Sequence, residues 1–251
     1  DRDMRSLGLQ QVREEVPGKA ATQRFAALLP KLPPEAQVGL LEALGDRKDV
    51  TARPAVVEML KNEEEKIRTA ALRALGNLGN GADVPLLARS AAAGSDWEKA
   101  AARQSLIRLR GDGVNAAIVA ALAKGKPDER IALLAALGAR HAVETAPTVL
   151  QYAEDSHAAV RLAAIGALRF LAGENHAAAV VKILKAAKDD KEQTAVESAL
   201  LAICGRGREA CADQLVAGLE NVDPPARIVL LHALGRAGGA KAMEAVVGRL
   251  K

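Results

Sequence analysis

A leucine that returns at a nearly constant interval is the feature that most constrains this chain. Leucines stand at positions 44, 75, 106, 137, 168, 200 and 234, so the successive intervals are 31, 31, 31, 31, 32 and 34 residues. A small residue precedes each leucine, and a glycine follows it at positions 45, 76, 138 and 235. Periods of this length are typical of solenoids, in which each repeat buries its apolar face only against its neighbours.

Each period contains two stretches with helical spacing. Within residues 51–78, one helix is predicted from about Ala52 to Lys61, a turn over residues 62–65, and a second helix that ends near Leu78. The apolar residues of the second stretch recur on one stripe, at positions 67, 71, 74, 75 and 78. We name the two helices A and B. No segment alternates apolar and polar residues with the period of two that is typical of a β-strand. The sequence therefore predicts an all-α, right-handed α-solenoid of antiparallel helix pairs.

Residues at the expected helix ends agree with this assignment of the A and B helices. Asp223 precedes Pro224, and Ser95 precedes Asp96, as expected for caps at the start of two B helices. The glycines that follow the leucines lie near the expected ends of B helices. We therefore expect them to adopt the left-handed conformation that terminates a helix.

Composition narrows the class of protein. Aromatic residues make up 2% of the chain and hydrophobic residues 49%, so alanine and leucine must fill the core. No stretch approaches the roughly 18 uncharged apolar residues of a membrane-spanning helix, so we expect no membrane insertion. The net charge of +4 arises from 35 basic and 31 acidic residues, a balance that does not favour nucleic-acid binding.

A basic residue completes the repeat pattern. Arginine stands seven positions before the leucine at Arg68, Arg130, Arg161 and Arg227, whereas Gln37, Lys99 and Gln193 depart from it. With its small residue, leucine and glycine, the chain resembles the short HEAT-like repeats of about 30 residues first noted in phycobilisome bilin lyases. The resemblance implies a HEAT/armadillo-like scaffold. It also divides residues 1–251 into a single array: half-repeat 1–16, repeats 17–48, 49–80, 81–111, 112–141, 142–174, 175–206 and 207–238, and half-repeat 239–251.

The B helices of such an array are expected to line a concave groove. Positions two before, two after and nine before each leucine point away from the buried side of the helix. We select six candidate groove contacts from these rows: Arg73, Trp97, Gln104, Arg108, Phe170 and His232. The alternative is a merely solvated wall whose two aromatic residues pack on neighbouring repeats. For the arginine row we expect bridges to carbonyls or acids of the next repeat, rather than a phosphate site.

Residues that could carry chemistry are sparse. The four histidines lie in different places of the repeat and each is followed by alanine, so the His-Glu pairs of deoxyhypusine hydroxylase, an iron-binding HEAT family, are missing. We expect no catalytic residue, no cofactor and no metal site. Cys204 and Cys211 form either a disulfide, which would indicate an exported or periplasmic protein, or two buried thiols in a cytoplasmic one.

Together these observations predict a non-catalytic scaffold or spacer for protein–protein interaction. Its partner would be a protein or peptide, and the array would be a fragment of a larger bacterial protein with neighbouring domains. The alternative is an enzyme or nucleic-acid binder that uses the same groove, of the DNA alkylation-repair or bilin-lyase type.

Overall fold

The computed structural model describes residues 2–248, and within them the chain is helical with no β-strand. Residue 1 of the first half-repeat and residues 249–251 of the last lie outside the described residues. The chain divides into two compact units, residues 1–133 and 134–251, with the boundary inside helix α9 (Pro127–Ala139). No helix of the described residues is long and apolar enough to cross a bilayer.

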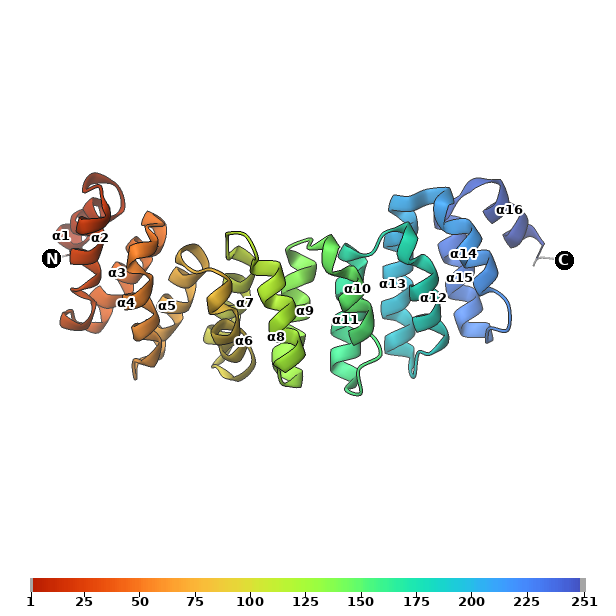
Figure 1. The fold of residues 1–251 in the computed structure, drawn as a ribbon, viewed down its shortest axis with the longest axis horizontal. Coiled ribbons are helices and arrows are strands. Elements are labelled where there is room, and N and C mark those ends of the chain that lie inside the picture. The colour runs from red at the N-terminus through yellow and green to blue at the C-terminus, as the bar shows by residue number, and fades with distance from the viewer. Residues whose placement is uncertain (1, 249–251) are drawn as a thin grey trace. The chain divides into compact units, whose positions relative to one another are not determined.

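The first unit alternates A and B helices (Figure 1). It opens with α1 (Arg2–Gln10), which passes into one turn of π-helix at Gln11–Glu15. The A helices are α2 (Lys19–Ala26), α4 (Arg53–Glu58), α6 (Val84–Ala93) and α8 (Val114–Lys124). The B helices are α3 (Pro34–Arg47), α5 (Glu65–Leu78) and α7 (Asp96–Arg108), followed by α9. Short 3₁₀ turns flank several A helices, at Leu29–Lys31, Val50–Ala52, Met59–Lys61 and Gly81–Asp83.

The second unit continues the alternation (Figure 1). Its A helices are α10 (Ala146–Tyr152), α12 (Ala177–Lys185), α14 (Ala212–Gly218) and α16 (Gly239–Val247). Its B helices are α11 (Ala158–Leu171), α13 (Asp190–Gly207) and α15 (Pro224–Ala237). Turns of 3₁₀ helix precede three of the A helices, at Val143–Thr145, Glu174–His176 and Arg208–Cys211.

The repeat leucines occupy equivalent, fully buried positions. All seven have a relative exposure of 0%: Leu44, Leu75, Leu106, Leu137, Leu168, Leu200 and Leu234. In the first unit α3 packs on α5 and α5 on α7, and in the second α11 packs on α13 and α13 on α15. The leucines are therefore buried in the core that the B helices form with their neighbours. The predicted all-α solenoid is confirmed, whereas the boundaries of the individual repeats stay a prediction.

The expected role of the repeat glycines is wrong. Gly45, Gly76, Gly138 and Gly235 all lie inside B helices, and none has a positive φ. A Cβ at Gly76 would lie 2.8 Å from the Oγ of Ser105 and 3.1 Å from its Cα. Cβ atoms at Gly45 and Gly138 would lie 3.1 Å from Ala74 Cα and 3.2 Å from Ala167 Cα, whereas nothing lies within 4 Å of a Cβ at Gly235. The first three glycines thus allow close helix packing, because each faces the small residue that precedes the leucine of the next repeat.

The two predicted caps are present. The Asp223 carboxylate accepts a hydrogen bond from the Ala226 backbone N–H at 2.9 Å. Ser95 and Glu98 form a reciprocal capping box at the start of α7. These bonds satisfy amides that the first helical turn leaves without partners.

Candidate binding groove

A groove in the first unit is lined by three consecutive B helices. Its volume is about 880 Å³, and its wall is formed by residues of α3, α5 and α7 together with Glu64. The apolar lining residues are Pro34, Val38, Ile67, Ala70 and Trp97. The charged ones are Glu35, Glu64, Glu65, Lys66 and Arg73, and Thr69 completes the wall. The groove therefore combines an apolar surface with three carboxylates and two cations.

Two of the six candidate contacts lie in this groove. Trp97 belongs to the first turn of α7 and is 68% exposed, an unusual exposure for the largest apolar side chain. Arg73, near the middle of α5, is also exposed. Tryptophan and arginine are two of the three residue types that are most enriched at interface hot spots.

The other four candidates are distributed over both units. Gln104 and Arg108 are exposed on α7 but do not line the groove. In the second unit Phe170 is 44% exposed, with the His141 ring edge-on at 5.7 Å and the Arg169 guanidinium 5.5 Å from its centroid. His232 pairs with Glu197 at 2.7 Å. Whether any of the six binds a partner stays a prediction.

Arg68 bridges successive repeats in the first unit. Its Nε donates to Oε1 of Glu98 at 2.6 Å, and its Nη1 donates to the carbonyls of Asn62 and Glu63 at 2.8 and 2.7 Å. The second carboxylate oxygen of Glu98 accepts from the Ser95 backbone N–H at 2.9 Å. The hydrogen bond and charge of Arg68 hold the pKa of Glu98 below its ordinary value, and burial opposes this effect.

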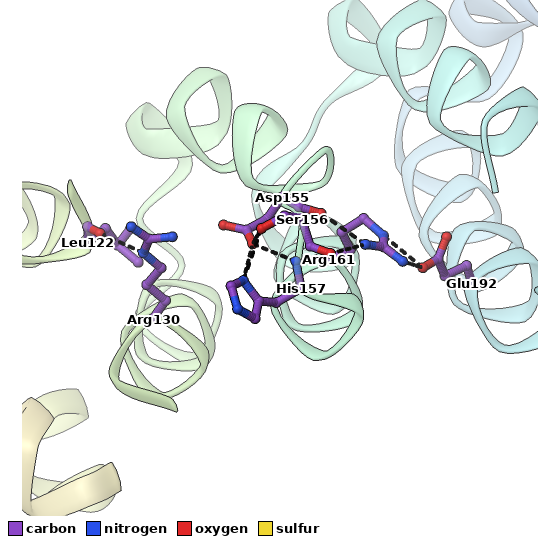
Figure 2. A network of polar contacts seen from close by, with 7 residues as sticks. All are labelled: Leu122, Arg130, Asp155, Ser156, His157, Arg161 and Glu192. Carbon is purple, nitrogen blue, oxygen red and sulfur yellow. Dashed lines mark hydrogen bonds and ion pairs between the residues drawn. The ribbon is translucent and has the colours of Figure 1, made fainter. Parts of the chain in front are cut away.

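Arg161 makes the equivalent bridge in the second unit (Figure 2). The side chains of Arg161 and Glu192 are more deeply buried than those of Arg68 and Glu98. Its Nε donates to Glu192 Oε1 at 2.8 Å, and its Nη1 donates to the carbonyls of Asp155 and Ser156. Glu192 in turn accepts the Lys188 backbone N–H.

The two remaining arginines of the row also bond to carbonyls. Arg130 Nε donates to Leu122 O at 3.2 Å (Figure 2), and Arg227 Nη2 donates to Val222 O at 3.2 Å. The arginine row is thus engaged within the fold. Glu98 and Glu192, the acidic partners that sequence reasoning missed, stand three residues after the N-caps Ser95 and Asp189, a spacing that could have revealed them.

A Ser-His-Asp cluster in the second unit is a turn rather than a catalytic arrangement. Asp155 Oδ1 accepts the backbone N–H of His157 at 2.8 Å and lies 3.2 Å from its Nδ1, while Ser156 Oγ lies 3.1 Å from the same nitrogen (Figure 2). The three residues are consecutive and bond to each other in the turn that precedes α11, which begins at Ala158. Across residues 2–248, no group of three or more His, Cys, Asp or Glu side chains could hold a metal ion.

Cys204 and Cys211 are both fully buried, and no bond joins their sulfur atoms in this structure. Burial is the main cause that raises the pKa of both, and the neighbouring Cys211 thiol raises that of Cys204 further. The two side chains therefore lie close together at the end of α13. A disulfide between them stays a prediction.

Several solved structures are similar to this chain at low identity. An engineered protein is 18% identical with a TM-score of 0.48, covering 91% of this chain and 71% of its own. The CpcE–CpcF complex of phycocyanin lyase from a Nostoc species is 22% identical with a TM-score of 0.41, covering 95% and 97%. Human deoxyhypusine hydroxylase in complex with glycerol is 19% identical with a TM-score of 0.40, covering 94% and 96%. None of these likenesses says what this chain binds or whether it catalyses a reaction.

A search of curated proteins finds no match. The family model for HEAT repeats matches residues 22–107 and 115–201, which together make up more than half of the chain. Both matched stretches contain the alternating A and B helices and the buried leucines described above. The chain belongs to the HEAT-repeat family.

Proposed function

We propose that this chain is a non-catalytic scaffold for protein–protein interaction and that the α3–α5–α7 groove is a docking surface. The single observation that carries the proposal is Trp97, which is 68% exposed and lines a groove of about 880 Å³. Leaving an indole in water forgoes the free energy of burying its apolar area, about 25 cal/mol per Å². A partner segment that covers the ring would recover it, as hot-spot residues do at interfaces.

The engagement of the arginine row supports a scaffold over a catalyst. Arg68 and Arg161 each bond to a carboxylate of the next repeat and to two carbonyls, so they serve the packing of the array. The exposed residues of the B helices then form the surface whose side chains differ from repeat to repeat. Such a surface suits the recognition of an extended partner, because the contacts of several repeats add up along it.

Selection from a displayed library of random peptides tests the proposal. Peptides enriched on the wild-type protein are measured against Trp97→Ala and Arg73→Ala, with Arg89→Ala as the control. Arg89 is an equally exposed arginine on the A helix α6, and it lies outside the groove. We expect Trp97→Ala to weaken binding by about tenfold or more, Arg73→Ala by less, and the control to leave binding unchanged.

Two results would count against the proposal. Selected peptides that bind wild type and Trp97→Ala equally would show that the groove is not the docking surface. Binding to duplex DNA that is measurable at about 150 mM salt and falls steeply with more salt would favour the nucleic-acid alternative.

A further inference from the structure

We infer that the groove recognises partner segments that carry an arginine or lysine, with the cationic group placed against the indole of Trp97. This inference rests on the proposed function, because it names the chemistry of the segment that the groove would bind. It follows from two properties of the wall: an indole with no cation placed over it and an excess of carboxylates over basic side chains.

No cation of the described residues lies over the indole of Trp97. Among the described residues, guanidinium groups lie over Phe25 (Arg47, 5.9 Å from the centroid) and over Phe170 (Arg169, 5.5 Å). No such contact is present at Trp97, although tryptophan is the aromatic ring that attracts cations most strongly. The chain thus provides cations for its two phenylalanines and leaves its best cation acceptor open in the groove.

The charges around the ring favour a basic ligand. Of the five charged lining residues, Glu35, Glu64 and Glu65 are acidic, and Lys66 and Arg73 are basic. Glu64 and Glu65 are exposed at the start of α5, and Arg73 lies eight residues further along the same helix. At 1.5 Å per residue Glu65 and Arg73 are about 12 Å apart along the helix axis, so Arg73 lies about two turns from the two carboxylates, whereas Lys66 directly follows them.

The test uses the peptides selected on the wild-type protein. Each is synthesised in its selected form and with every arginine and lysine replaced by glutamine. Because Trp97 is the only tryptophan of the chain, its fluorescence directly reports occupancy of the groove. We expect the selected pool to be enriched in basic residues and the glutamine versions to bind about tenfold more weakly.

A double variant separates charge from shape. Glu64→Gln with Glu65→Gln should weaken the basic peptides several-fold and leave their glutamine versions unaffected. Glu63→Gln is the matched control, since Glu63 is an exposed acid of the same turn that does not line the groove.

The failure of this inference differs from failure of the proposed function. Peptides that require Trp97 but show no enrichment in basic residues, or bind equally well as glutamine versions, would overturn the preference for cations and keep the docking groove. Peptides that do not require Trp97 would overturn both.

Discussion

Replacement of Gly76 by alanine tests whether the repeat glycines exist for close helix packing. The added Cβ would lie 2.8 Å from Ser105 Oγ and 3.1 Å from Ser105 Cα, both tighter than ordinary van der Waals contact. Ser105 cannot easily move, because it is 1% exposed and its hydroxyl donates to the Leu72 carbonyl at 2.7 Å. Overpacking of this kind costs about 1–3 kcal/mol. Alanine gains about 1 kcal/mol in helix propensity, so the net destabilisation is about 0–2 kcal/mol.

Gly235 provides the matched control. It follows a repeat leucine as Gly76 does and stands at the same place from the end of its helix, but nothing lies within 4 Å of its Cβ position. Gly235→Ala should therefore stabilise by up to about 1 kcal/mol. Gly166→Ala, at another open position inside α11, should behave in the same way.

The assay is urea denaturation followed by helical circular dichroism, with hydrogen exchange to assign the effect to α5 and α7. Exchange is needed because two compact units need not unfold in one transition. We expect faster exchange in α5 and α7 for Gly76→Ala only. Equal stabilisation by Gly76→Ala and Gly235→Ala would refute the packing role of the glycine.

Three further predictions concern the ion pairs and the thiols. Arg68→Gln should lower the free energy of unfolding, measured with denaturant, by about 2 kcal/mol. Arg161→Gln should lower it by about 3–5 kcal/mol, because the side chains of Arg161 and Glu192 are only 8% and 3% exposed. Equal losses for the two variants would refute the role of burial. Since Arg68 lowers the pKa of Glu98, their pair stabilises the fold above the ordinary pKa of 4.5, and that stability is lost as the pH falls through the lowered value. Glu98→Gln should therefore show a shallower loss of helical signal on acidification than wild type, and a parallel loss would contradict the assignment. Because burial raises the pKa of both Cys204 and Cys211, a thiol reagent should react with the reduced protein only after denaturation. If protein that was denatured without prior reduction has no reactive thiol, the disulfide is established.

Local pattern was enough to predict the fold, because a solenoid is built from near-neighbour contacts. The apolar stripe of the B helix and the caps at Ser95 and Asp223 are each contained within one repeat, and the leucine interval connects a repeat only with the next one. The direction of the arginine row was also predictable, since a guanidinium close to the buried leucine must find an acceptor nearby.

Contacts between repeats were harder to predict. A glycine near a helix end has two explanations, a left-handed cap or a close approach, and only the distance from Gly76 to Ser105 of the next helix decides between them. The groove was predictable as a surface of B helices but not in its extent. Ile67, for example, is 1% exposed and was assigned to the core, yet it also lines the groove.

The shared carboxylate of Glu98 affects how the array responds to strain. If the junction between two repeats parts, Arg68 keeps its carbonyl acceptors and Glu98 keeps the Ser95 amide, so neither charge is left bare. An isolated buried ion pair would have no such reserve, and its rupture would cost several kcal/mol. The residues that join adjacent repeats therefore also lower the free-energy cost of separating them at this junction.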